Sequence, residues 1–390
     1  MSEILESISI QGFKSIRDLE AFKFNHINVL IGSNGAGKSN FVSFFRLLGE
    51  LFGQRLQLFL AQEGGADACL YLGPQQTKEL KAELKFGING YAFSLVPTAD
   101  GRLAFSDEST LYMGHLVGGQ VTKRSLGSGH FEARLKDRKA ESGFKASKGA
   151  SHYVFETLSN WMVYHFHDTS PFAKVRRPGV INDNEILRPN AENLAAFLLR
   201  LQQTDAETYS KIRDVVRVAA PFFDDFKLRP TTANPELIQL EWQQRDSNYP
   251  MLASQLSDGT LRFICLATAL LQPRRPKTIL VDEPELGLHP YALSLFGNLV
   301  QKSVAPWGIP IHQVILSTQS ALLLNEFTPE DVVVVDRANG QSTFQRLATA
   351  QLNEWLADYT LGELWQKNLL GGRPRLDSQK KPPAPAEISS

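Results

Sequence analysis

The sequence predicts an α/β fold, and three patterns along the chain support this prediction. An apolar strand at 27–31 runs into a glycine-rich loop that is followed by a helix. Far downstream, strand, helix and strand alternate at 278–281, 290–304 and 314–317. Near the N-terminus, residues 4–10 alternate apolar and polar side chains, as a half-buried strand does. We therefore expect a sheet covered by helices, together with a second layer of antiparallel strands.

The composition is that of an ordinary globular protein. Hydrophobic residues make up 43% and charged residues 21% of the 390 residues, and the formal net charge is zero. A neutral chain lacks the broad positive field of an obligate nucleic-acid coat. The two cysteines, Cys69 and Cys265, are too few for a disulfide framework and fit a reducing cytosol. Because no apolar run approaches about 20 residues, we expect a cytoplasmic protein that does not itself span a membrane.

The first 105 residues are predicted to form one lobe that carries the glycine-rich loop. A turn at 12–16 separates its first two strands, and the helix after the loop is expected over 40–62. Gly64 and Gly65 end that helix, because glycine accepts a left-handed backbone. Residues 80–105 are predicted to form two or three further strands, with turns at Gly90 and Asp100-Gly101.

The pattern changes over 106–250, which we assign to an inserted α+β subdomain. Its segment 122–151 is rich in glycine, serine and basic residues, and we interpret this basic loop as mobile and solvated. A local patch that contacts phosphates is the alternative. Helices are expected at 193–201 and 206–219. The basic residues of the loop are Lys123, Arg124, Arg134, Lys136, Arg138, Lys139, Lys145 and Lys148.

The chain returns to alternating helices and strands over 251–371, the predicted second lobe. It begins with a helix at 261–271 and ends with a hairpin between 331 and 347, turned at Asn339-Gly340. Residues 372–390 are rich in proline and are expected to form a disordered tail.

The glycine-rich loop at 32–39 has the pattern G-x-x-x-x-G-K-S of a phosphate-binding loop, between a strand and a helix as its function requires. Lys38 would reach the β- and γ-phosphates, and the Ser39 hydroxyl would bind Mg²⁺. ATP and Mg²⁺ are therefore the expected ligands. The residues of the loop assigned to the nucleotide are Gly32, Asn34, Gly35, Gly37, Lys38, Ser39 and Asn40.

Two carboxylates follow the apolar strand at 278–281. Asp282 would lie at the carboxyl end of that strand, beside the phosphate loop, where it can hold Mg²⁺ through water. Glu283 would polarise an attacking water as a general base. A pair of acids that merely ends a strand before Pro284 is the alternative, and the loop at Lys38 makes it the weaker one.

Ser257 and Gly259 open the helix predicted at 261–271, about two dozen residues before Asp282. A serine at this position is explained structurally as an N-cap. The free N–H groups and the positive end of the helix could also receive the γ-phosphate of a nucleotide bound to another subunit. We favour this second interpretation, in which two subunits share each site.

These motifs together resemble an ABC-type ATPase of the RecF/SMC/OLD-like group, in the branch of RecF-like AAA family ATPases. The resemblance implies a P-loop ATPase head with an antiparallel strand layer, a helical lobe carrying the signature, and two ATPs buried between two heads. It further implies that 286–288 crosses the dimer interface and that Lys14 and Ser15 lie near the nucleotide. Gln62 is a weak candidate for the glutamine that senses Mg²⁺. The matching segments are 10–16, 35–40, 256–260, 282–290, 316–320 and 361–365.

The chain departs from the general ABC pattern at Asp258, which replaces a glycine, at Thr260, and at Gln319, which stands where a switch histidine is common. Glutamine can hydrogen-bond a phosphate or a water but cannot carry a proton. We count Gln319 with Glu283 and Lys38 as catalytic and expect slow hydrolysis.

His165, His167 and Asp168 raise the alternative of a metal site, since two histidines share one face of a strand. Further ligands are not evident nearby in the sequence, so we favour a buried structural histidine or a hydrogen-bonded pair.

The resemblance implies an ATP-gated dimer, or a higher oligomer, in DNA repair or anti-phage defence, with DNA as a partner. The alternative is a regulatory scaffold that controls a separately encoded effector without acting on DNA. OLD-like relatives carry a nuclease domain after the head. Because this chain ends soon after Gly371-Gly372, we expect any nuclease or toxin to be a partner that contacts 361–370.

Overall fold

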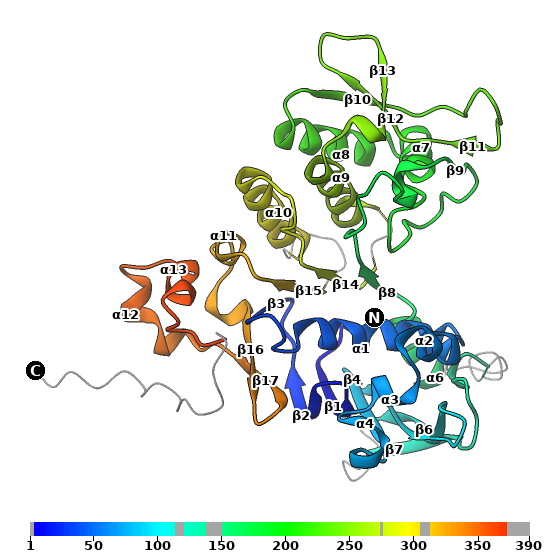
Figure 1. Ribbon diagram of the computed structural model, residues 1–390, viewed down its shortest axis with the longest axis vertical. Helices are drawn as coiled ribbons and strands as arrows, with labels where there is room; N and C mark the ends of the chain where they lie inside the picture. The colour runs from blue at the N-terminus through cyan, green and yellow to red at the C-terminus, as the bar shows by residue number, and fades with distance from the viewer. Residues whose placement is uncertain (1–3, 114–120, 138–149, 274–275, 305–312, 373–390) are drawn as a thin grey trace, which may run out of the picture.

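The computed structural model describes residues 4–113, 121–137, 150–273, 276–304 and 313–372 (Figure 1). Residues 373–390 of the predicted tail (372–390) and residues 138–149 of the predicted basic loop lie outside these ranges. Over the described residues, every helix is too short or too polar to cross a lipid bilayer. Cys69 and Cys265 are both buried and free.

The central sheet of the described chain has the strand order β17-β16-β3-β15-β14-β8. Its inner strands pair in parallel, and only β17 is antiparallel to its neighbour within this sheet. The carboxyl ends of β3, β14 and β15 therefore meet at one edge, which is where ligands bind in such sheets. The strands are β3 (Ile27–Ile31), β8 (Trp161–Tyr164), β14 (Thr278–Asp282), β15 (Gln313–Thr318), β16 (Val332–Ala338) and β17 (Gln341–Arg346).

The second sheet is fully antiparallel and has the order β2-β1-β4-β5-β6-β7. It confirms the predicted α/β head with an antiparallel strand layer. Its strands are β1 (Ser7–Phe13), β2 (Ile16–Lys23), β4 (Leu80–Phe86), β5 (Asn89–Pro97), β6 (Leu103–Tyr112) and β7 (Thr122–Gly127).

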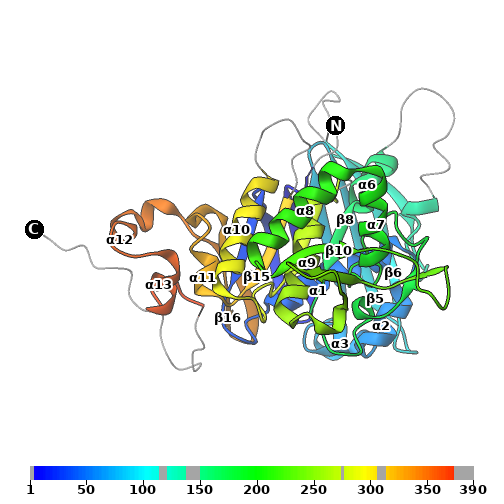
Figure 2. The same cartoon turned by 90° about the horizontal axis from the view of Figure 1, so that it is seen from above.

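Helix α1 (Lys38–Phe52) lies between the two sheets (Figure 1). Phe41 and Phe44 of α1 are buried against one face of the central sheet, formed by residues such as Leu280 and Ile315. The opposite face, which includes Val281, packs against α9 (Asp258–Leu271) and α10 (Pro290–Ser303). Seen from above, α9 and α10 lie over these strands (Figure 2). The phosphate loop is thus held between two hydrophobic cores.

A helical lobe stands above the central sheet (Figure 1). It combines α7 (Leu194–Thr204), α8 (Ala206–Ala219) and α9 with a sheet of order β10-β12-β13. The strands are β10 (Phe223–Lys227), β12 (Glu241–Gln244) and β13 (Pro250–Leu252), and β9 (Gly179–Val180) pairs with β11 (Leu237–Ile238). The remaining helices are α2 (Leu56–Glu63), α3 (Ala66–Cys69), α4 (Gly73–Gln76), α6 (Ala150–Leu158), α11 (Ala321–Leu324), α12 (Asn353–Leu356) and α13 (Leu361–Gln366).

Two expectations about element bounds in the first lobe need correction. The helix expected over 40–62 is two helices, because the chain breaks at Gly53 and at Gln54, which has a positive φ of 56°. The turn expected at Gly90 lies earlier, at Gly87; Gly90 is a β5 residue where a Cβ would approach the Leu84 carbonyl oxygen to 2.8 Å.

The bounds of the inserted subdomain are corrected as well. The boundary at 106 cuts β6, which pairs with β5 along its length, and the start of the predicted basic loop is strand β7. β7 is held by its antiparallel pairing with β6, and Lys123 on β7 also forms an ion pair of 2.8 Å with Asp107 of β6. Strand β8, also inside the assigned range, belongs to the central sheet. Strand pairing over long sequence distances decides these bounds.

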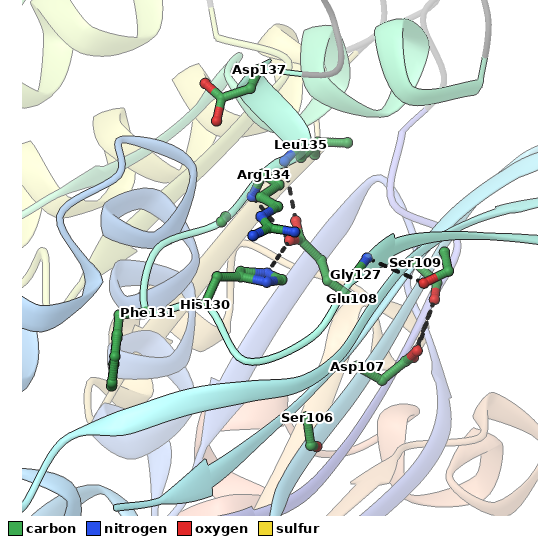
Figure 3. Close-up of polar contacts among 12 residues, drawn as sticks. Ser106, Asp107, Glu108, Ser109, Gly127, His130, Phe131, Arg134, Leu135 and Asp137 are labelled. Carbon is green, nitrogen blue, oxygen red and sulfur yellow. Dashed lines mark hydrogen bonds and ion pairs between the residues drawn. The ribbon is translucent and has the colours of Figure 1, made fainter.

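A buried carboxylate fastens the chain after β7 to β6 (Figure 3). The fully buried Glu108 accepts hydrogen bonds from the Tyr91 hydroxyl (2.8 Å), His130 Nε2 (2.7 Å) and the backbone N–H groups of Arg134 (2.9 Å) and Leu135 (3.2 Å). Burial, and next the charge of Glu108, raise the pKa of Tyr91 well above its usual value, so the phenol remains a donor. The network satisfies the charge inside the lobe.

Replacing Glu108 with alanine is expected to destabilise the protein by about 3–5 kcal/mol, because it leaves buried donors without a partner. The matched control is Asp107→Ala on the same strand, which removes a half-exposed ion pair and should cost less than about 1 kcal/mol. Urea unfolding followed by circular dichroism compares the two variants. Equal losses of stability would contradict the assigned role of Glu108.

Candidate nucleotide-binding site

The glycine-rich loop joins β3 to α1 in a tightly packed conformation. Gly37, the N-cap of α1, has φ 116° and Gly35 has φ 79°, values that favour glycine. A Cβ on Gly37 would overlap Ser342, and one on Gly32 would overlap the Val335 carbonyl oxygen. A Cβ on Gly35 would meet no described atom within 4 Å. The loop is therefore packed against Val335 and Ser342 at Gly32 and Gly37 and is open at Gly35, where a phosphate could approach the backbone.

Replacing Gly37 with alanine is expected to weaken nucleotide binding at least ~10-fold, because the new Cβ must displace Ser342 and strain a left-handed residue. Gly49→Ala is the control: it lies in the same helix, has open space around it and should be neutral or slightly stabilising. Titration with a fluorescent ATP analogue measures both affinities. Undiminished binding by Gly37→Ala would show that this loop conformation is not needed.

Lys38 is buried at the base of the loop, with 4% of its surface exposed. Its Nζ donates hydrogen bonds to the carbonyl oxygens of Gly32 (2.6 Å) and Ser33 (3.1 Å). Burial lowers the pKa of Lys38, while the charges of Glu283 and Asp282 act in the opposite direction. The lysine and both carboxylates therefore share one electrostatic environment.

Ser39 and Asn34 are exposed at the open side of the loop. Asn40, assigned to the nucleotide, donates instead to Ser15 Oγ (2.7 Å). Ser15 Oγ also lies 2.7 Å from Ser342 Oγ, which donates to the backbone of the loop. These contacts tie the β1–β2 hairpin to the rear of the phosphate loop.

Gln62, the weak candidate for sensing Mg²⁺, is exposed at the end of α2. Its neighbour Glu63 accepts a hydrogen bond of 2.6 Å from Lys14, which also donates to Ser43 of α1. Lys14 therefore supports α1 from behind. Among the described contacts, it is Glu63, not Gln62, that is linked through Lys14 to α1, the helix that follows the phosphate loop.

Asp282 and Glu283 lie at the carboxyl end of β14, next to the end of β15. Ser317 donates its hydroxyl to Asp282 Oδ1, and the backbone N–H of Glu283 donates to the Ser317 carbonyl oxygen at 3.0 Å. Glu283 has φ 42°, which is uncommon for a residue with a side chain and costs about 1–3 kcal/mol. The fold thus holds Glu283 in a strained turn immediately after Asp282.

Gln319 contacts the predicted general base directly. Its Nε2 donates to Glu283 Oε1 at 2.5 Å, and its backbone N–H donates to Glu285 Oε1 at 2.6 Å. The amide group therefore orients the Glu283 carboxylate within the same chain.

Glu285 is a site residue that the sequence reasoning did not single out. Burial raises its pKa, and its Oε2 is buried without a hydrogen-bond partner among the described residues. The charge of Glu285 also acts on Lys38. The repeated acids in Asp282-Glu283-Pro284-Glu285 were the available signal.

Ser257 is the N-cap of α9. Ser257 Oγ accepts a hydrogen bond of 3.1 Å from the Thr260 backbone N–H, and Gly259 packs so closely on Gly287 that a Cβ would overlap its carbonyl oxygen. Ser257 therefore contacts its own helix, and Gly259 contacts the 286–288 loop. Among the described residues, no hydrogen bond joins the Ser257 side chain to the phosphate loop. The exposed Ser257 side chain remains available to another molecule.

Arg176, which the sequence reasoning missed, holds the signature from behind. Its buried guanidinium donates to the carbonyl oxygens of Ala253 and Leu256, and to Asp258 Oδ1 at 2.7 Å. Asp258, the departure from the usual glycine, is therefore paired with a cation of the inserted segment.

The histidines after β8 are exposed, so the expectation of a buried structural histidine is corrected. His167 Nε2 lies 3.9 Å from Asp282 Oδ2. The parallel pairing of β8 with β14 brings them together, and no local pattern in the sequence indicates that pairing.

The fold and the site define a class: a P-loop ATPase head with a phosphate loop and an Asp-Glu pair at the ends of adjacent parallel strands. Residues 161–325 match the family model described as "AAA domain, putative AbiEii toxin, Type IV TA system", and residues 7–61 match an "AAA domain" model. A search of curated proteins found no match.

Solved structures share the fold. The head of an SMC protein bound to the C-terminal winged-helix domain of ScpA has a TM-score of 0.58 at 14% identity, over 90% of this chain and 99% of that chain. The Pyrococcus furiosus SMC head with an extended coiled coil, bound to the C-terminal domain of ScpA, has a TM-score of 0.56 at 14% identity, over 91% and 98%. The family matches are to AAA domain models, and the fold is shared with SMC heads.

Proposed function

We propose that this chain binds ATP with Mg²⁺, hydrolyses ATP slowly and works as an ATP-gated dimer in DNA repair or anti-phage defence. The observation that carries the proposal is the convergence of Lys38, Asp282 and Glu283 at one edge of the central sheet, behind an open phosphate loop. The AAA domain matches support the same ligand.

The residues present fit a magnesium nucleotide. Lys38 is buried with its charge turned toward carbonyl oxygens of its own loop, which a phosphate would replace as partners. Ser39 is exposed and Asp282 is partly exposed, and both offer the oxygen ligands that Mg²⁺ prefers. When bound, Mg²⁺ would neutralise charge on the β- and γ-phosphates.

The chain's own groups then account for hydrolysis. Lys38 neutralises the charge that develops on the transferred phosphoryl group. Glu283 accepts a proton from the attacking water, and Gln319 holds the Glu283 carboxylate in place. Because Gln319 cannot itself carry a proton, we expect turnover to be slow and the ATP-bound state to be long-lived.

The composite site is supported by the exposed first turn of α9. Ser257 and Gly259 lie at a helix N-terminus, where backbone N–H groups favour an anion. Leu286 on the neighbouring loop is also exposed, although it is apolar. A second copy placing its nucleotide on α9 would cover both features.

The alternative function, control of a separately encoded effector, is favoured by the neutral net charge and by the C-terminal segment. α13 is attached to the head, since the Gly362 backbone N–H donates to Asn325 Oδ1 at 2.7 Å. A Cβ on Gly372 would lie 3.2 Å from the Gly32 Cα, so the segment after α13 packs on the phosphate loop. An effector bound at 361–370 would therefore contact an element next to the nucleotide.

ATP turnover and sedimentation of wild-type protein, with and without duplex DNA, test the proposal. Slow turnover that DNA raises, with ATP-dependent dimers, supports the DNA-linked function. ATP-dependent dimers that ignore DNA would exclude repair and leave the scaffold. Protein that neither binds nor hydrolyses ATP would overturn both.

A further inference from the structure

His167 reaches the Mg²⁺ side of the site from the segment that follows β8. Strand β8 pairs in parallel with β14, and Tyr164 is opposite Val281. Both strands therefore end at the same edge of the sheet. Asp282 follows Val281 directly there, and His167 comes three residues after Tyr164. The pairing, which joins residues over one hundred positions apart, places an imidazole beside the aspartate.

The distance and exposure of the pair are suited to a water between them. His167 Nε2 and Asp282 Oδ2 are 3.9 Å apart, too far for a direct hydrogen bond. One water at ~2.8 Å from each could bond both groups. The His167 side chain is 39% exposed and that of Asp282 19%, so both can be reached from solvent. Asp282 Oδ1 already accepts from Ser317, which leaves Oδ2 facing His167.

The backbone of the His167 segment is held by the signature helix. Arg262 on α9 donates from Nε to the Phe166 carbonyl oxygen (2.8 Å) and from Nη2 to that of His167 (3.1 Å). Arg262 is buried, and Phe166 is buried and stacked on Tyr164 with ring centroids 5.3 Å apart. The backbone that carries His167 is therefore held in place by α9 and by the buried Phe166 ring.

We propose that His167 is a positioning residue for the metal, whose Nε2 accepts a hydrogen bond from a water of the Mg²⁺ shell held at Asp282. The proposal rests on the proposed binding of ATP and Mg²⁺. Mg²⁺ prefers oxygen ligands and keeps several waters, so a histidine beside it acts on a bound water. Partners of this kind orient the inner ligands and strongly affect metal affinity. His167 thereby links the metal to the helix that carries Ser257.

The test compares the affinity for a fluorescent ATP analogue in Mg²⁺ and in EDTA. His167→Phe keeps a planar ring without the hydrogen bond, His167→Gln keeps a hydrogen-bonding group, and His165→Ala is the control in the same segment. We expect His167→Phe to lose about 10-fold of the Mg²⁺-dependent gain in affinity while its affinity in EDTA is unchanged. His167→Gln should retain most of the gain, and His165→Ala all of it.

A Mg²⁺-dependent gain that is the same in His167→Phe as in wild type would overturn the inference alone. An equal loss in EDTA and in Mg²⁺ would assign His167 a structural role and also overturn it. Wild-type protein that binds no nucleotide would overturn the proposed function and the inference together. Thermal melts of both His167 variants show that each is folded, and because the side chain is substantially exposed, neither should unfold the chain.

Discussion

Replacing Glu283 with glutamine is expected to lower ATP turnover by ~100-fold or more and to leave ATP binding intact. The amide has the shape of the carboxylate but cannot accept a proton from water. Glu283 lies directly after Asp282, in a strained turn with φ 42°, and Gln319 donates to it at 2.5 Å. Backbone strain of this kind is concentrated at functional sites, which agrees with a chemical role for Glu283.

Single-turnover hydrolysis and equilibrium binding of ATP separate the two effects of Glu283→Gln. The control is Glu330→Gln, which changes an exposed acid just before β16 and should match wild type. If Glu283→Gln hydrolysed ATP at the wild-type rate, another group would have to be the general base.

Replacing Lys38 with alanine is expected to weaken ATP binding by about 10–100-fold, since a charge-assisted hydrogen bond contributes about 1.5–3 kcal/mol. The ammonium is buried, and its present partners are carbonyl oxygens of Gly32 and Ser33. Removing it leaves the phosphates facing three carboxylates, Asp282, Glu283 and Glu285, whose charges act on Lys38. Turnover should fall with binding.

Isothermal titration with ATP and Mg²⁺ measures the Lys38→Ala effect. Lys23→Ala, an exposed lysine on β2, provides the matched loss of one positive charge and should bind ATP as wild type does. An equal, small loss of ATP affinity in both variants would mean that Lys38 acts only through the overall charge of the protein and not through contact with the phosphates.

The sequence predicted the parts of the site that follow directly from local patterns. The strand at 27–31, the loop after it and the strand ending at Asp282 need only apolar runs and glycine spacing, and their bounds are confirmed within a residue. The cap by Ser257 is likewise local, because its hydroxyl bonds a residue three positions later.

The contacts that complete the site were not predictable in the same way. His167, Arg176 and Arg262 come together with Asp282 and the signature only because β8 pairs with β14 and the insert packs on α9. Each contact spans about 80 to 115 positions, so no short-range pattern encodes it. The strain at Glu283 depends in the same way on the neighbouring strand β15.

We propose that a second copy completes each nucleotide site through Ser257. The most direct test is light scattering of Glu283→Gln protein with saturating ATP and Mg²⁺, compared with the same protein carrying Ser257→Arg. Glu283→Gln carrying Ser125→Arg, on exposed strand β7 of the other sheet, is the control. We predict ATP-dependent dimers for Glu283→Gln and for the control, and monomers that still bind ATP for Ser257→Arg. Dimers of equal stability with Ser257→Arg, or monomers throughout, would contradict the shared site.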